Sequence, residues 1–229
     1  MPETASGHYP FKPFLTSSHF ALLRGAGEGQ GRRLLDVGCG EGFLAERLSA
    51  KGWKVVGIEG DPVLAERARR HCEEVLVSDL NRETPEIPGT FEAILYGDIL
   101  EHLASPQPLF HRLNQSLRPG GTVILSIPNV AHLWVRLSLL FGRFEYAQRG
   151  ILDRTHLRFF TRRSLRRFLE EEQVGSIDWA AIPVPLELVI PQRWQGSWLV
   201  WLQRAHLLAA RCWPQGLAYQ FVVKGRIHS

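Results

Sequence analysis

A regular alternation of short apolar runs with helical segments is the feature that most constrains how this chain can fold. Strands that alternate with helices imply a mostly parallel, doubly wound sheet with helices on both faces. Parallel strands buried on both faces read as continuous apolar runs, as these do. The expected strands are Arg33–Val37, Lys54–Ile58, Val75–Val77, Phe91–Tyr96 and Thr122–Ile127. The expected helices are Phe43–Ala50, Pro62–His71, Ile99–His102 and Pro108–Ser116.

This rhythm breaks after Ile127. Two closing strands are expected near the C-terminus, and a tryptophan-bearing amphipathic stretch separates them. Thr161 is suited to cap the helix that it precedes. The later elements are expected to be an apolar helix (Asn129–Phe141), an arginine-rich loop (Gly142–Phe160), a helix (Thr161–Gln173), a strand (Gly175–Pro183), the amphipathic stretch (Trp194–Trp213) and a last strand (Ala218–Gly225).

With 229 residues, the chain has room for one generous α/β domain and hardly for two. We expect a single domain over 1–229. It consists of an N-terminal cap segment (1–31), a ligand-binding core (32–129), a lid with amphipathic helix insertions (130–215) and a closing strand (216–229). In the cap segment, Tyr9, Phe11 and His19 either close over the ligand or pack against the first helix.

The composition is that of an ordinary globular protein, with 45% hydrophobic and 22% charged residues. No stretch reaches the ~20 apolar residues of a membrane span, and the first residues do not resemble a secretory signal. Cys39, Cys72 and Cys212 lack the spacing of a metal site or a disulfide framework, which favours reduced thiols. We therefore expect a cytoplasmic protein, with contact to a membrane surface left open.

The segment LLDVGCGEGF places Asp36 and three glycines, Gly38, Gly40 and Gly42, between the first strand and the next helix. Ligands of open α/β sheets bind beyond the carboxyl ends of the strands, and glycines let the backbone turn sharply and approach a ligand there. The spacing is G-x-G-x-G rather than the G-x-G-x-x-G of dinucleotide-binding loops. An acid here repels a pyrophosphate but attracts an ammonium group. S-adenosylmethionine (SAM), which carries an ammonium and no phosphate, fits this loop.

Acids after the next two strands support the same ligand. Glu59 follows the second strand, where a carboxylate can bridge two ribose hydroxyls. Asp79 follows the third strand and either accepts from an adenine amino group or caps a turn. Asp61 precedes Pro62 and is expected to cap the next helix.

In this order and spacing, the segments LLDVGCGEG, VVGIEGD, FEAILYGDILEHLASP and LRPGGTVILSIPN resemble class I SAM-dependent methyltransferases. The later segments PNVAH, GILDRTHLRFFTRRSL and AYQFVVKG resemble a bacterial group that is associated with small molecules and polysaccharides and is similar to the O-methyltransferases of ubiquinone biosynthesis. The resemblance implies a Rossmann-like sheet of seven strands whose last strand is antiparallel to the rest. It also implies SAM as cofactor and S-adenosylhomocysteine as product.

Carried over position by position, the resemblance assigns the methionine part of SAM to the glycine loop and the ribose to Glu59. The adenine pocket falls to Asp79 and Leu80, and the sulfonium lies beside the segment after the fourth strand. The cofactor-binding residues implied are Asp36, Gly38, Cys39, Gly40, Glu59, Gly60, Asp79, Leu80, Gly97, Asp98 and Ile99.

Methyl transfer to a hydroxyl requires a base that takes the hydroxyl proton. The catalytic candidates are His132, after the fifth strand, and Asp153 and His156, in the loop expected to cover the site. Asp153 and His156 can instead hold that loop in shape, and His102 of the LEHL turn is expected to be structural. The carboxylates and histidines lack ligand spacing along the chain, so the sequence predicts no metal.

The acceptor is expected to be a small molecule, a saccharide or a lipid-linked compound. Arginines concentrated between residues 143 and 167 can face phosphates, so a nucleic-acid methyltransferase is an alternative, ranked lower because YGDILEH lacks the N-P-P-[YF] motif of base methylation. A third alternative is a non-catalytic module that binds SAM or docks a partner. The Trp194–Trp213 stretch either packs against the domain, forms a homodimer or lies on a membrane surface.

Overall fold

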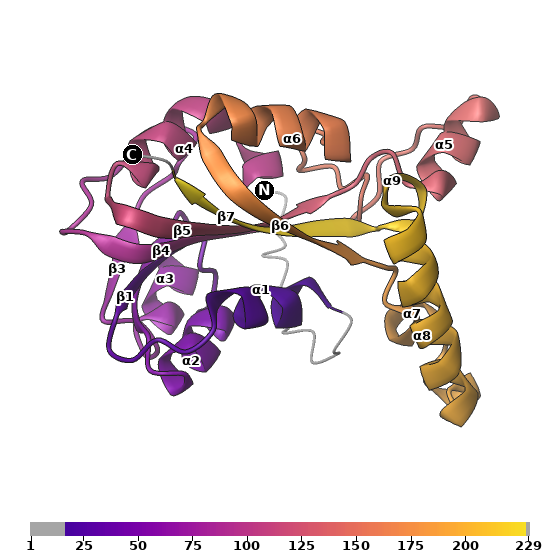
Figure 1. Cartoon of the computed structure of the whole chain (residues 1–229), viewed down its shortest axis with the longest axis horizontal. Coiled ribbons are helices and arrows are strands. Elements are labelled where there is room, and N and C mark those ends of the chain that lie inside the picture. Colours follow the sequence, from indigo (N-terminus) through magenta and orange to yellow (C-terminus); the bar gives the residue numbers. More distant parts are fainter. Residues whose placement is uncertain (1–16, 228–229) are drawn as a thin grey trace, which may run out of the picture.

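The computed structural model describes residues 17–227, and within them one sheet of seven strands runs through the molecule with helices on both faces (Figure 1). Tyr9 and Phe11, for which the sequence leaves open a role over the ligand or in packing the first helix, lie outside the described residues. The strand order is β3-β2-β1-β4-β5-β7-β6. The strands are β1 (Arg33–Val37), β2 (Lys54–Glu59), β3 (Glu74–Val77), β4 (Phe91–Gly97), β5 (Leu117–Pro128), β6 (Val174–Ile182) and β7 (Gln220–Ile227).

The first five strands are parallel, as their continuous apolar runs predict. At the centre, Val37 at the end of β1 pairs with Ile58 of β2 on one side and Tyr96 of β4 on the other. All three side chains are fully buried. Because these strands end in register, the loops that follow them meet at one edge of the sheet, where ligands of such folds bind.

The last strand runs against its neighbours. β7 is antiparallel to both β5 and β6, so the expected reversal of the final strand is confirmed. The pairing of Pro128 with Gln220 brings the start of β7 to the carboxyl end of β5. Gln220 therefore lies at the same edge of the sheet as the loops after β1, β2 and β4.

Two helical layers enclose the sheet. In Figure 1, α4 and α6 cover one face, and α1, α2 and α3 cover the other. Thr161 caps α6, where its side chain accepts from Ser164 N and the Ser164 hydroxyl accepts from Thr161 N. The bounds are α1 (Ser18–Ala26), α2 (Phe43–Ala50), α3 (Pro62–Ala68), η1 (Leu100–His102), α4 (Pro106–Asn114), α5 (Leu133–Leu140), α6 (Arg162–Glu171), α7 (Leu186–Val189), η2 (Gln192–Trp194), α8 (Ser197–Cys212) and α9 (Pro214–Leu217).

The helix expected from Asn129 begins only at Leu133, because Asn129 has another role. Its buried side-chain amide donates to Ala218 O at 2.8 Å and to Gln215 O at 3.1 Å, and its oxygen accepts from Ala131 N at 3.1 Å. Asn129 thus joins the end of β5 to the start of β7, and His132 becomes the N-cap of α5.

The long helix α8 turns its tryptophan face to the solvent and packs a different face against the domain. Its buried side chains are Leu199, Gln203 and Ala210, whereas Trp198 is 49% exposed and Trp201 is 69% exposed. The expectation that the tryptophan face of this helix packs against the domain is therefore wrong. The amide of Gln203 explains the orientation, since it lies within 3.4 Å of Leu186 N and Val184 O and anchors the helix through its polar group.

Candidate active site

The loop after β1 takes left-handed backbone conformations at all three of its glycines, with φ of +74° at Gly38, +56° at Gly40 and +84° at Gly42. A side chain at Gly38 would collide with Ile99 at 2.8 Å, and one at Gly42 would press on the backbone of Ala68 at 3.0 Å. At Gly40, no atom of the described residues lies within 4 Å of the place that a Cβ would take. Gly38 and Gly42 therefore serve packing, while Gly40 borders open space that a ligand can occupy.

Glu59, at the end of β2, fixes this loop. One carboxylate oxygen accepts from Gly40 N at 2.8 Å, and the other accepts from Asp61 N at 2.9 Å. Gly38 N and Cys39 N both donate to Ile58 O, at 2.8 and 3.0 Å. Each oxygen of Glu59 retains lone pairs that can accept ribose hydroxyls, so the same side chain can order the loop and contact a ligand.

Asp36 lies beneath the loop as a buried carboxyl group. It is 2% exposed, and its Oδ2 is buried without a hydrogen-bond partner among residues 17–227. Burial, and then the neighbouring charge of Glu59, raise the pKa of Asp36 to about 7. A buried carboxylate lacking a partner is costly, and a ligand ammonium at this point would satisfy it.

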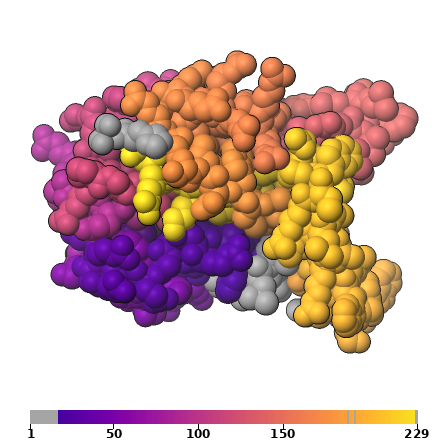
Figure 2. Space-filling model, viewed as in Figure 1, coloured from indigo at the N-terminus to yellow at the C-terminus, as the bar shows by residue number. Residues whose placement is uncertain are grey.

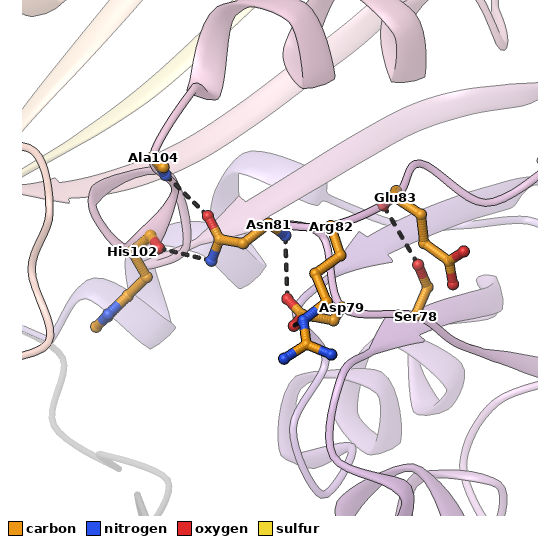
Figure 3. A network of polar contacts seen from close by, with 7 residues as sticks. All are labelled: Ser78, Asp79, Asn81, Arg82, Glu83, His102 and Ala104. Atoms are coloured by element: carbon orange, nitrogen blue, oxygen red, sulfur yellow. Dashed lines mark hydrogen bonds and ion pairs between the residues drawn. The ribbon is translucent and has the colours of Figure 1, made fainter.

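The loop after β3 is ordered by its own side chains (Figure 3). Asp79 accepts from Asn81 N at 3.1 Å and pairs with Arg82 at 3.1 Å. The amide of Asn81 bridges to η1, donating to His102 O at 3.1 Å and accepting from Ala104 N at 2.8 Å. Asp79 thus caps a turn, as one of its two interpretations predicts, and its contact with adenine stays a prediction together with those of Leu80 and Gly60.

The segment after β4 contains a strained residue. Asp98 has a left-handed φ of +51°, which is uncommon outside glycine and is typical of functional positions. Its backbone N donates to Ser126 Oγ at 3.0 Å, and its Oδ1 accepts from Ser126 Oγ at 2.5 Å and from Gln220 Nε2 at 3.1 Å. The last strand therefore holds Asp98 in place, between Gly97 and Ile99, beside the glycine loop.

The lid segment docks on η1 through its backbone. Leu157 N and Arg158 N both donate to Glu101 O, at 2.8 and 3.0 Å. The guanidinium of Arg158 donates to Ala104 O. These bonds bring a loop more than fifty residues away in sequence against the turn that follows β4. Arg158, one of the arginines concentrated between residues 143 and 167, therefore contributes to the fold.

His156 and Asp153 are brought to that contact. The Nδ1 of His156 lies 3.1 Å from Ile151 O, and burial, followed by the neighbouring His102, lowers the pKa of His156. Burial alone would raise the pKa of Asp153, but hydrogen bonds from Thr155 N and Oγ1, at 2.9 and 2.8 Å, outweigh it and lower the pKa. His156 is therefore neutral at pH 7, and Asp153 is an ionised group that shapes the loop.

His132 is placed differently. Its Nδ1 accepts from Trp134 N at 3.2 Å, so the proton of the neutral ring resides on Nε2. That Nε2 is buried with no partner in the described part of the chain, and burial, followed by His206 of α8, lowers the pKa of His132. An imidazole in this tautomer offers a proton rather than a lone pair at its free nitrogen. Of the catalytic candidates, His156 is the one whose tautomer suits a base.

Sequence reasoning missed three residues of this site: Glu101, Ser126 and Gln220. Glu101 lies one residue before His102, and folding brings both to His156, so that one ligand atom of each lies within 4.8 Å of the others. The sequence analysis found no ligand spacing because it compared only residues that are close along the chain. The adjacent Glu101 and His102 of the LEH triplet, close after the fourth strand, were the sequence feature that could have indicated this cluster.

This sheet order, the reversed β7 and the acid-bearing glycine loop together define the class I SAM-dependent methyltransferases. A family model described as a methyltransferase domain matches residues 16–173, and the chain belongs to that family.

Curated relatives include a ubiquinone biosynthesis O-methyltransferase from Xanthomonas campestris pv. campestris (strain B100). It is 36% identical over 132 residues, covering 55% of this chain and 54% of that protein. The mitochondrial enzyme of the same name from Schizosaccharomyces pombe is 27% identical over 151 residues, covering 62% of this chain and 54% of its own. The chain thus matches about half the length of these relatives.

Solved structures support the fold. A SAM-dependent methyltransferase from Archaeoglobus fulgidus has a TM-score of 0.62 at 16% identity and covers 91% of this chain and 92% of its own. A Haemonchus contortus phosphoethanolamine N-methyltransferase, solved with SAM, has a TM-score of 0.62 at 18% identity and covers 92% of this chain and 52% of its own. At such identities the likeness concerns the fold alone.

Proposed function

We propose that the chain binds SAM at the edge of the sheet where β1, β2 and β4 end, and transfers its methyl group to a hydroxyl of a small, lipid-linked acceptor. The observation that carries the proposal is the buried carboxyl oxygen of Asp36 beneath the glycine loop, which has no hydrogen-bond partner within residues 17–227. In this arrangement Asp36 would pair with the ammonium of SAM, and Gly40 and Glu59 would hold the carboxylate and the ribose of SAM.

Methyl transfer from a sulfonium is an in-line displacement. The acceptor oxygen forms a bond to the methyl carbon as the carbon–sulfur bond breaks, and S-adenosylhomocysteine leaves. The enzyme chiefly positions the acceptor and excludes water. His156 is the group proposed to take the hydroxyl proton, because its Nδ1 is held at Ile151 O and its Nε2 carries the lone pair. Asp98 positions the segment that flanks the sulfonium.

Lipid linkage of the acceptor is supported by a surface that we call the α5–α8 face. Both helices extend beyond the carboxyl edge of the sheet (Figure 1), and Figure 2 shows α8 standing out from the rest of the molecule. The name covers the exposed apolar side chains of α5, of Phe141 directly after it, and of α8: Trp134, Leu137, Leu139, Leu140, Phe141, Trp198, Val200, Trp201, Leu202 and Leu208.

Charge favours an anionic lipid surface as the occupant of this face. Arg204 lies over the Trp201 ring at 5.2 Å, and Arg193 lies over Trp194 at 5.3 Å. The sequence of helix α8 contains arginines and no acidic residue. Exposed tryptophan with flanking arginine is typical of helices that lie in a membrane interface. None of the helices among residues 17–227 is long and apolar enough to cross a bilayer.

Vesicle binding tests this surface. The protein is expected to cosediment with vesicles containing phosphatidylglycerol and much less with vesicles of phosphatidylcholine alone. A Trp198→Ser, Trp201→Ser double variant should bind at least about tenfold more weakly, because it loses two large apolar side chains. Val63→Ser, at an exposed apolar position on α3, is the control. Equal binding by the double variant would contradict the assignment. So would concentration-dependent dimerisation without vesicle binding.

The acceptor class is tested with SAM that carries a labelled methyl group. When protein and labelled SAM are incubated with an extract of the host cells, the label is expected in the lipid-soluble fraction. Appearance of the label in RNA or DNA would replace this proposal with the nucleic-acid alternative, and label in free saccharide would remove the lipid linkage.

A further inference from the structure

We propose that Glu101, His102 and His156 bind a divalent transition-metal ion, such as Mn²⁺ or Zn²⁺, which activates the acceptor hydroxyl. The inference rests on the proposed function for its role in the reaction, but the site itself is argued from side-chain geometry alone. One ligand atom from each of the three residues lies within 4.8 Å of the others, close enough for a single ion to bring all three into coordination.

The hydrogen bonds of both imidazole rings leave the correct nitrogen free for an ion. The Nδ1 of His156 lies 3.1 Å from Ile151 O, and the Nδ1 of His102 lies 3.2 Å from Thr155 O. The Thr155 hydroxyl, 3.1 Å from the same nitrogen of His102, donates its proton to Asp153 Oδ1 and so also acts as an acceptor toward the ring. A carbonyl oxygen only accepts, so each ring donates from Nδ1 and keeps its lone pair on Nε2. A backbone carbonyl on the second nitrogen is the usual partner of a metal-binding histidine. The rings are already adjacent, with centroids 4.8 Å apart.

The third ligand is a buried carboxylate. Glu101 is 1% exposed, and neither of its carboxylate oxygens has a hydrogen-bond partner among the residues that the structure describes. A buried carboxylate without a partner is costly, and a divalent ion coordinated by Glu101 would stabilise it.

The site is held from two sides. The backbone of Glu101 accepts from Leu157 N and Arg158 N of the lid. On the other side, Asn81 binds the backbone of η1, and Figure 3 shows the His102 ring extending away from that contact. These bonds fix the ligand residues before an ion arrives.

Two imidazoles with one carboxylate favour a transition ion over Mg²⁺ and leave coordination positions open for a substrate oxygen. An acceptor hydroxyl bound at such a position becomes more acidic. Its proton is then released to water, the oxygen forms its bond to the methyl carbon, and the carbon–sulfur bond breaks. With the ion bound, His156 acts as a ligand. In the metal-free protein, His156 would take the proton itself.

Titration of the full chain with Mn²⁺, followed by the loss of the free-ion signal in electron paramagnetic resonance, tests the site without any assay of activity. One Mn²⁺ per chain is expected to bind, and Zn²⁺ is expected to displace it. Glu101→Gln and His156→Asn should each weaken binding at least about tenfold, since each removes a ligand. His111→Asn, an exposed histidine of α4, should bind as the wild type does.

Circular dichroism of each variant establishes that it is folded, and His102→Asn provides a third ligand change. Absence of stoichiometric Mn²⁺ and Zn²⁺ binding by the wild-type chain would overturn the inference, as would equal binding by the folded ligand variants. SAM binding is measured on the same samples. A chain that binds SAM but no ion refutes this site alone, whereas a chain that binds an ion but no SAM refutes the proposed function.

Discussion

Lowering the pH from 7 to 5.5 is expected to weaken SAM binding by about tenfold per pH unit. Burial, and secondly Glu59, raise the pKa of Asp36 to about 7. Below that value the free protein carries a protonated, neutral Asp36, while the ammonium of SAM favours its ionised form. Binding therefore releases a proton, and the affinity falls as pH decreases through the raised pKa and levels off above it. Calorimetry across this range measures the slope.

Asp36→Asn tests the origin of that slope. The amide retains the shape of the side chain but leaves the buried ammonium without a counter-charge, which costs about 3–5 kcal/mol and therefore lowers the affinity at least about 100-fold. The remaining affinity should lose its dependence on pH in this range. Asp178→Asn, an exposed acid on β6, is the matched control. Wild-type affinity in Asp36→Asn would show that Asp36 does not contact the cofactor.

His156→Asn is expected to lower the rate of methyl transfer by about 10²–10⁴-fold, while SAM binding stays within about threefold of the wild type. The amide can neither take a proton at this pH nor replace imidazole as a ligand. The lowered pKa of His156 keeps the ring neutral at pH 7, so the wild-type rate should fall only at acidic pH. Incorporation of labelled methyl groups at saturating SAM measures the effect.

His111→Asn controls for loss of a histidine outside the site. Rates with a chelator and with added Mn²⁺ separate the two roles of His156, because a base acts in both conditions and a ligand acts only with the ion. Full activity of His156→Asn in both conditions would exclude His156 from the chemistry and would return attention to His132 and Asp153.

The sheet could be predicted because its signals are local. The expected bounds of Arg33–Val37 and Phe43–Ala50 agree with those in the structure, since a buried run followed by glycines marks a strand end, and helical spacing marks the next element. The role of Asn129 could not be predicted in the same way. Its side-chain amide donates to Ala218 O, and this contact exists only once β7 has paired with β5.

The residues proposed to bind the cofactor could be selected from the sequence, because they follow successive strands. The acceptor side was not, because it joins distant segments. Glu101 and His156 meet only when the lid backbone docks on η1, and Gln220 reaches Asp98 only through the antiparallel pairing of β7. The orientation of α8 was hidden for a related reason, since the polar Gln203, rather than the tryptophans, faces the domain.

The SAM site at the glycine loop is tested by titration of the wild-type chain with SAM and S-adenosylhomocysteine near pH 7.5. One site per chain with micromolar or tighter affinity for both compounds is expected, because they share the groups assigned to Gly40, Glu59 and the loop after β3. Binding of neither compound at micromolar concentrations, by a folded chain, would contradict the assignment of a SAM site to the glycine loop.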